Sequence, residues 1–381
     1  MKKIVSAALV GAMVAGAAFA DVKISTNYRL GTNLLTINPG EGDGATDVQG
    51  FNDITKSAWG DTTKIAASGE NAGIEIDLKT DESNISMDYA YAWLGWGNFK
   101  LYGGRRDARG YIKRVNPLDG NWWNNYCEYG KPGLHKDLKG VAIDAANLTV
   151  DKTGAKAVNF TADYNINDTM NVAAAFFKNA TSEKVFDILN VAGQFNMKHE
   201  MFNLNVTAKY ARNANTDADD DVWSVGAFAN IIAVENLDTL LGLTFGKDEA
   251  TSDKVFTGID LRLAYTMDAL KLYTLNNITL NDGDMISWHT LGAAYKVSDV
   301  LSALGLQMII NSGATAWSNA SDAKNTKEYI AVRPYIDLTA QKNAVLSIGA
   351  ELKFANFMAN SDADEKVDFQ FTVPVVMRVK L

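Results

Sequence analysis

Residues 367–381 read VDFQFTVPVVMRVKL, and this stretch alternates apolar and mostly polar side chains up to its last residue. The apolar series consists of Val367, Phe369, Phe371, Val373, Val375, Met377, Val379 and Leu381. Successive side chains of a β-strand point to opposite faces of a sheet. A period of two over the whole stretch therefore predicts one long strand with an apolar face and a wet face.

The same alternation recurs along the chain. It is clear in the ranges 22–30, 74–79, 85–93, 158–166, 202–210, 259–265, 330–338 and 346–354. Many of these segments run for about nine to twelve residues, which is enough for a tilted strand to cross a bilayer core. Their composition predicts a protein built from many amphipathic strands.

The connections between these segments alternate in length from residue 166 onward. Short links are predicted at 167–168, 197–199, 234–235, 267–268, 298–299 and 341–342. Longer polar stretches lie around 179–184, 212–221, 247–254, 281–284, 312–326 and 355–365. Short turns at one rim and long loops at the other are typical of barrels that span an outer membrane.

Backbone chemistry restricts how such strands can cross a membrane. Every N–H and C=O group in hydrocarbon must be paired within the protein, so only helices or closed barrels can span. After residue 20 no apolar run is long enough for a membrane helix. The sequence therefore predicts an all-β protein, a transmembrane antiparallel β-barrel with an even number of strands, about 16–20.

The polar faces of the predicted strands carry many charges. They include Asp77, Lys79, Lys209, Asp260, Arg262, Arg333, Glu351 and Lys353. A dry core cannot accept such groups unpaired. We therefore expect a wide, water-filled interior.

The first twenty residues predict an export signal. Lys2 and Lys3 precede an apolar run, residues 4–19, and Ala18-Phe19-Ala20 has the form of a cleavage site. This pattern predicts a signal peptide at 1–20 and a mature barrel domain at 21–381. A transmembrane anchor is the alternative, although the run is short and rich in Ala and Gly.

Composition excludes several function classes. The formal net charge of −9 argues against nucleic-acid binding. Cys127 is the single cysteine, so no intramolecular disulfide can form. The histidines, His135, His199 and His289, lack metal-site spacing, and no G-x-S-x-G elbow is present. We expect no enzyme activity, no cofactor and no metal, with a barrel hydrolase as the alternative.

Residues 62–106 carry a family resemblance. They contain TKIAASGENAGIEIDLKTDESNISMDYAYAWLGWGNFKLYGGRR, which is similar to the general bacterial outer-membrane porin family in its order of strands, tight turns and final Gly-Gly-Arg. The resemblance implies a water-filled channel for passive diffusion of small hydrophilic solutes and ions. It also implies a homotrimer among the lipids of the outer membrane of a diderm bacterium.

Two features depart from the family pattern. The chain ends in Leu381, whereas family members usually end in an aromatic residue that helps the assembly machinery. The tally of strands, about 18–20, is also higher than in the general porins. Residues 139–156 decide the parity, because they can form one strand or two short ones.

The resemblance implies that a long loop, residues 106–137, folds inward and narrows the pore. The candidate pore-lining residues are Arg105, Arg106, Arg109, Lys113, Arg114, Asp119, Glu128, Lys209, Arg262 and Arg333. Arginines at a constriction would favour anionic or zwitterionic solutes. Alternatively, these cations pair with neighbouring acids and only hold the loop.

Two sets of aromatic residues also have alternative interpretations. In the loop, Trp122, Trp123, Tyr126 and Tyr129 could stack on sugar rings, but packing against the wall is the simpler interpretation. We expect Tyr89, Tyr91 and Trp93 to form an interfacial girdle facing lipid. Two other functions stay open: a non-conducting structural or adhesive surface barrel, and a soluble exported β-sandwich.

Overall fold

The computed structural model describes fifteen stretches of the chain: residues 21–38, 47–53, 61–81, 84–105, 108–113, 134–135, 143–144, 148, 158–178, 190–211, 221–248, 254–281, 284–311, 329–355 and 368–381. Within these stretches the regular structure consists of strands, and no helix is long and apolar enough to cross a membrane. The predicted signal peptide, residues 1–20, lies outside the described residues.

Twenty strands form one sheet in which every neighbouring pair is antiparallel. The first part of the sheet contains β1 (Asp21–Asn38), β2 (Asp47–Asp53), β3 (Asp61–Ser68), β4 (Ala72–Asp81), β5 (Asn84–Trp96), β6 (Phe99–Arg105), β9 (Val158–Asn165), β10 (Met170–Lys178), β11 (Asn190–Lys198) and β12 (Phe202–Ala211). The second part contains β13 (Val222–Ile231), β14 (Leu237–Asp248), β15 (Phe256–Met267), β16 (Leu270–Asn281), β17 (Asp284–Tyr295), β18 (Leu301–Asn311), β19 (Tyr329–Gln341), β20 (Ala344–Gly349), β21 (Glu351–Ala355) and β22 (Asp368–Lys380).

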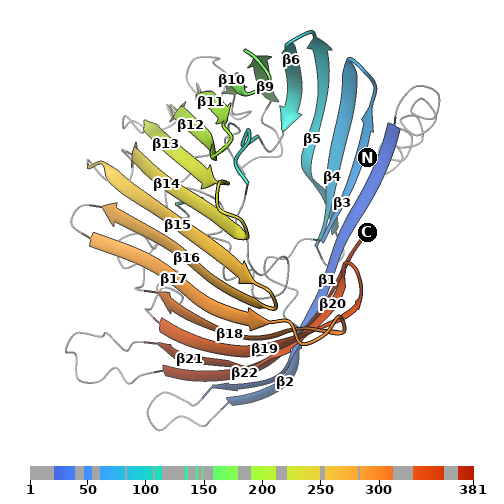
Figure 1. The fold of residues 1–381 in the computed structure, drawn as a ribbon, viewed down its shortest axis with the longest axis vertical. Helices are drawn as coiled ribbons and strands as arrows, with labels where there is room; N and C mark the ends of the chain where they lie inside the picture. The colour runs from blue at the N-terminus through green and yellow to red at the C-terminus, as the bar shows by residue number, and fades with distance from the viewer. Residues whose placement is uncertain are drawn as a thin grey trace.

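The sheet closes on itself, because β1 pairs with β22. Figure 1 shows the strands following one another around a ring, with the first and last strands side by side. β2 and β3 both pair with β1 and form one position in the ring, as β20 and β21 do beside β19. The result is a closed antiparallel barrel of 18 strands, which confirms the predicted fold class and the even number.

The split between β20 and β21 has a local cause at Pro334. Ala350 lies between the two strands and donates its N–H to the Pro334 carbonyl at 3.0 Å. Proline has no N–H to return a second bond. The register to β19 is the same on both sides of this point, so β20 and β21 continue one strand across a missing bond.

The two faces of the wall have the reverse polarity of a water-soluble protein. On β14 the side chains of Leu241, Leu243 and Phe245 are 40–42% exposed, whereas Thr244 between them is fully buried. On β15, Ile259 is exposed while Asp260 and Arg262 are buried. Apolar side chains cover the convex outer face and polar side chains cover the concave inner face, which is the arrangement of a barrel in lipid.

Glycines on the inner face lie under aromatic rings of the neighbouring strand. The directly opposed pairs are Gly73 with Trp93, Gly242 with Phe228, Gly246 with Phe256, Gly292 with Tyr273, and Gly305 with Tyr335. A Cβ atom on Gly242 would lie 2.5 Å from the Phe228 ring. Each ring therefore fills the space that the side chain of a larger residue would occupy and covers the glycine backbone, an arrangement known as aromatic rescue of a strand glycine.

The short connections confirm the predicted turns. Asn236, Asp268 and Asn343 adopt positive φ angles of 61°, 48° and 76°. Asn and Asp tolerate this left-handed region better than most residues. Each lies in a tight connection between consecutive strands, at the same rim of the barrel.

Two details of the sequence-based assignment change. Residues 143–144 (β8, Ile143–Asp144) pair with β7 (Leu134–His135) in a separate two-stranded sheet, and the described part of 139–156 contributes no strand to the barrel. In β5 the register shifts between Asp77 and Leu78 of β4, so Asp88 has no partner and the strand bulges. A bulge exchanges the faces on its two sides.

Candidate functional site: the inner wall and its docked segment

The inner face of β11–β13 carries a group of amides that we call the amide wall. It consists of Gln194, Asn196, Asn203, Asn205, Thr207 and Asn230. All six side chains are buried, with Asn205 and Thr207 at 0% exposure. Buried amides are stable only when their donors and acceptors are matched.

Four members of the amide wall form a closed ring of hydrogen bonds. Asn205 donates to Asn196 Oδ1 at 2.8 Å, and Asn196 donates to Gln194 Oε1 at 2.8 Å. Gln194 donates to Thr207 Oγ1 at 3.1 Å, and Thr207 donates back to Asn205 Oδ1 at 2.9 Å. Each group is donor and acceptor in the same ring, so the four side chains fix one another's orientation.

The connection after β6 docks on this wall through its backbone. The carbonyls of Ala108, Arg109 and Tyr111 accept hydrogen bonds of 3.2–3.3 Å from Gln194, Asn205 and Asn203. At the end of the segment, Asn230 accepts from the Lys113 N–H at 2.7 Å and donates to the Lys113 carbonyl at 3.1 Å. Residues 108–113 thus lie on the inner side of the ring (Figure 1), which places this part of the predicted loop inside the barrel.

Gly110 allows the close approach of the segment. Its φ is +58°, and a Cβ atom there would lie 1.9 Å from Asn196 Oδ1. Both the backbone conformation and the space require glycine. Ile112 N–H donates to the Arg109 carbonyl at 3.2 Å, closing a tight turn around Gly110.

A second point of the same connection touches the inner wall. Leu148 N–H donates to the Ala108 carbonyl at 2.8 Å. Its side chain is fully buried in an apolar cluster with Ala173, Ala175 and Ala192, against which Ala108 packs. The described parts of the connection between β6 and β9 are therefore held at both Ala108 and Leu148.

Only some of the predicted pore residues on this connection can be placed. Arg109 is half-buried and Lys113 is exposed, both in the docked segment. Arg105 is the last residue of β6, and its side chain lies outside the described part. The residues that lie outside the described stretches are Arg106, Arg114, Asp119 and Glu128, together with the loop aromatics Trp122, Trp123, Tyr126 and Tyr129.

Lys209 lies on the inner face of β12, two residues after Thr207. It is buried, with Ala192 and Ser224 as its cross-strand neighbours. The structure therefore brings Lys209 to the same wall as the docked segment, although the two are far apart in sequence.

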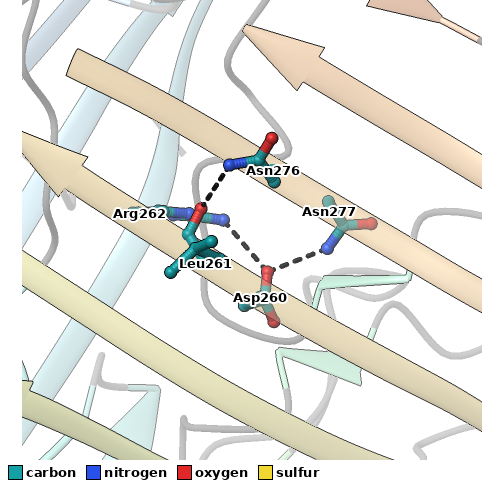
Figure 2. A network of polar contacts seen from close by, with 5 residues as sticks. All are labelled: Asp260, Leu261, Arg262, Asn276 and Asn277. Carbon is teal, nitrogen blue, oxygen red and sulfur yellow. Dashed lines mark hydrogen bonds and ion pairs between the residues drawn. The ribbon is translucent and has the colours of Figure 1, made fainter. Parts of the chain in front are cut away.

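Asp260, Arg262, Arg333 and Glu351, on strands β15, β19 and β21, form what we call the charged wall. Figure 2 shows its first half: Arg262 Nη2 lies 3.3 Å from Asp260 Oδ1, and Asn277 donates to the same oxygen at 2.8 Å. Both charged side chains are almost completely buried. Asp260 is thus neutralised by a neighbour two residues along its own strand.

The second half of the charged wall is the pair of Arg333 and Glu351. Both Nε and Nη2 of Arg333 contact Glu351 Oε2, and Nη1 lies 3.4 Å from Gln307 Oε1. The three residues lie on β19, β21 and β18, so the pair joins neighbouring strands. The premise that wall charges need water because they lack partners is therefore wrong for these groups, since they pair with each other.

The opposite part of the wall, β4–β6, is aromatic. Lys100 Nζ lies 4.5 Å from the centre of the Trp93 ring, and Tyr91 packs edge-on against Tyr102. Trp93 also covers Gly73 on the inner face. The expected lipid-facing girdle is therefore wrong for Tyr91 and Trp93, because the bulge at Asp88 turns this part of β5 inward.

A cavity of about 500 Å³ lies on the inner face at the short-turn rim. Its charged lining residues are Asp268, Lys271, Lys296, Asp337, Arg378 and Lys380. Arg378 donates to Asn27 Oδ1 at 2.7 Å across the closure of the barrel. Four cationic and two acidic side chains give the lining of this cavity a net positive charge.

In the described part of the chain, no group of three or more His, Cys, Asp or Glu side chains could hold a metal ion. His199 Nδ1 accepts the Met201 N–H at 3.2 Å, and His289 Nδ1 lies 2.9 Å from Asn276 Oδ1. Both imidazoles are thus used in local hydrogen bonds.

Sequence reasoning missed the amide wall. The alternation at 202–210 predicts only a wet strand face there, without a role for its amides, and residues 194–196 are not among the predicted strand segments. A usable signal was the cluster of Asn and Gln at period two on two consecutive strands, opposite a glycine-containing loop.

Comparisons with known proteins find similar solved structures only at low identity. No protein-family model and no curated protein matches the chain. Among the similar solved structures are bacterial outer-membrane porins and channels. A mutant of the Rh. blastica porin matches with a TM-score of 0.47 and 12% identity, over 95% of this chain and 100% of that chain.

Two further structures match over similar lengths. The outer-membrane channel DcaP of Acinetobacter baumannii has a TM-score of 0.49 and 9% identity, over 96% of this chain and 98% of that chain. A loop-deletion mutant of OmpT of Vibrio cholerae has a TM-score of 0.42 and 11% identity, over 95% and 99%.

Proposed function

We propose that this protein is an outer-membrane porin, a channel for passive diffusion of small hydrophilic solutes and ions. The observation that carries the proposal is the reversed polarity of a closed barrel: exposed Leu and Phe outside, polar side chains inside. A connection docked on the inner face adds the element that can narrow such a channel. The mechanism requires positioned charges and water but no catalysis.

The proposal includes a location and an assembly. Residues 1–20 would direct export and be removed, and residues 21–381 would insert among outer-membrane lipids as a homotrimer. The support is the signal-like N-terminal sequence and the apolar outer face. N-terminal sequencing of the mature protein and cross-linking in native membranes test these two points.

We also propose a preference for anionic or zwitterionic solutes. Arg109 and Lys113 lie on the docked segment, and the cavity at the short-turn rim has a positive balance. In contrast, Arg262 and Arg333 are paired with carboxylates and contribute little net charge. Selectivity would therefore depend on the docked segment and the rim more than on the charged wall.

Conductance of purified protein in planar bilayers tests the channel. We expect stepwise, ohmic conductance increases that scale with salt concentration, together with heat-modifiable migration on gels. A folded barrel that inserts into bilayers without raising conductance would refute the channel. Migration as a soluble protein without detergent would refute the barrel in lipid.

Charge reversal tests the selectivity. Arg109→Glu combined with Lys113→Glu should shift the reversal potential in a salt gradient toward cations. Lys254→Glu is the control, because this exposed residue lies just before β15, at the long-loop rim of the barrel. Unchanged reversal potentials in the double variant would remove both residues from the pore.

One observation favours a second function, a non-conducting structural or adhesive barrel. The charges of the charged wall are buried and neutralised, as expected for a filled interior rather than a stream of water. Such a barrel would insert and show heat-modifiable migration but give no conductance steps. The bilayer recording thus separates the two candidates.

A further inference from the structure

We propose that the hydrogen-bonded ring of Gln194, Asn196, Asn205 and Thr207 is a preformed seat that holds residues 108–113 and thereby sets the aperture of the channel. This inference rests on the proposed channel function. It assigns a positioning role to four neutral side chains, none of which would contact a solute as a charge.

The ring is complete before the segment is counted. Each of its four side chains donates one hydrogen bond to the next and accepts one from the previous, at 2.8–3.1 Å. Asn205 and Gln194 each also direct an amide hydrogen to a segment carbonyl, that of Arg109 and that of Ala108. The orientation that satisfies the ring therefore also orients the donors toward the segment.

The seat binds backbone rather than side chains. The seat contacts the carbonyls of Ala108 and Arg109. The neighbouring amides Asn203 and Asn230 contact the carbonyls of Tyr111 and Lys113 and the Lys113 N–H. The side chains of Arg109 and Lys113 are not used as anchors in these bonds. Position and charge are thus separated: the wall fixes the segment, and the segment's own side chains determine what electrostatic field it presents.

Neutral amides suit this task better than ion pairs. A buried charge needs a partner of opposite charge. Ions and charged solutes in the lumen would compete for either member of such a pair. An amide pairs with a peptide group without adding charge to the pore. The charged wall contains ion pairs, whereas the amide wall supplies side-chain hydrogen bonds to the backbone of the described segment.

Gly110 provides the sharpest test, because no side chain of the seat is replaced. In Gly110→Ala, the added Cβ would lie 1.9 Å from Asn196 Oδ1, so the contact between segment and seat must open, by movement of the segment or of the Asn196 amide. Gly97→Ala is the matched control: its φ is +57°, but nothing lies within 4 Å of its Cβ position. Both variants carry the same backbone strain, and only Gly110→Ala collides with the seat.

Single-channel conductance and hydrogen exchange are the readouts. In Gly110→Ala we expect conductance to change by about 1.5-fold or more, with increased open-channel noise, as the segment moves in the lumen. Exchange of the amides in 108–113 should accelerate about tenfold for each seat hydrogen bond lost. Gly97→Ala should match the wild type in both measurements.

Asn205→Leu tests the seat from the wall side. This change removes the bond to the Arg109 carbonyl and breaks the ring, and it should reproduce the conductance and exchange changes of Gly110→Ala. Asn277→Ala is the control for truncating an inner-wall asparagine, because Asn277 bonds Asp260 and not the segment. If Asn205→Leu fails to fold, Asn203→Ala at the edge of the wall replaces it.

The outcomes separate this inference from the channel itself. A wild-type protein that does not conduct refutes the channel, whereas the exchange experiment still tests the seat. A conducting wild type with unchanged conductance and exchange in Gly110→Ala and Asn205→Leu refutes the seat. Equal changes in Gly110→Ala and Gly97→Ala would also refute it, because strain alone would then explain both.

Discussion

The amide wall and the charged wall solve the same problem with different chemistry. Both present buried polar groups on the inner face of the barrel. On the amide wall, Asn205 and Gln194 each donate one hydrogen bond within the ring and one to the backbone of residues 108–113. On the charged wall, Asp260 with Arg262 and Arg333 with Glu351 bond mainly within the wall. Neutral groups can hold the backbone of a separate segment, while opposite charges pair with each other.

The largest loss of unfolding free energy should come from breaking an ion pair of the charged wall. Arg333→Met leaves the Glu351 carboxylate buried without its counter-ion, which costs about 3–5 kcal/mol of unfolding free energy. The double variant Arg333→Met with Glu351→Leu should recover most of this loss. Urea unfolding of the barrel in lipid vesicles measures both.

An exposed ion pair is the control for that prediction. Lys64 and Glu75 lie 2.7 Å apart, but their side chains are 45% and 22% exposed. Lys64→Met should therefore cost about 1 kcal/mol or less. Equal losses in Lys64→Met and Arg333→Met would contradict the distinction between buried and exposed pairs.

Packing beside the amide wall should give an intermediate effect. In Gly242→Ala the new Cβ would lie 2.5 Å from the Phe228 ring, which should cost about 1–3 kcal/mol of unfolding free energy. In Gly193→Ala nothing lies within 4 Å, so we expect no loss or a small gain. If Gly242→Ala is as stable as Gly193→Ala, the aromatic ring does not constrain the glycine.

Removing a charge from the charged wall should have a smaller effect, a change in ion selectivity. Asp260→Asn removes the carboxylate paired with Arg262 and leaves one positive charge, which should raise the anion-to-cation permeability ratio about twofold. The reversal potential in a salt gradient measures this ratio. An unchanged reversal potential would show that Arg262 does not face the conducting path.

The smallest effect is expected at the rim. Asp299 accepts a hydrogen bond from Lys296 at 2.7 Å, and this bond lowers the pKa of the Asp299 carboxyl below the usual 3.8. A lowered pKa stabilises the fold at pH values above 3.8, and this contribution is lost as pH falls through the lowered value. The thermal stability of Asp299→Asn should therefore be slightly below wild type near neutral pH and equal to it in strong acid.

Much of the fold follows from period-two patterns, because one face meets lipid and the other does not. The strand at the C-terminus, the tight turns and the closed even-numbered barrel are all readable from residues such as Phe371, Val373 and Asp268. The face of Tyr91 and Trp93 was not readable, because a single bulge residue reverses it. Periodicity identifies a strand more securely than it identifies which side faces inward.

The inner site was less predictable than the wall. The resemblance to porins indicated an inward loop, and the docked residues 108–113 agree with it. Arg333 and Glu351 lie opposite each other on the two sides of the tight turn at Lys342 and Asn343, so their pairing depends on the exact register of this hairpin, which a period of two does not fix. The bonds from Asn205 and Asn203 to the segment span more than 90 positions, and they depend on closure that one sequence cannot specify.

The contact between β1 and β22 has a consequence for how the barrel assembles. It joins Asn27 to Arg378, residues separated by 351 positions, whereas most other pairs join strands that follow each other in the chain. Hairpins can therefore form early and locally, and the seam must wait until both ends meet. Until then two strand edges are open at once, which makes this seam the step where a helper protein would shield the nascent sheet from sticking to other chains.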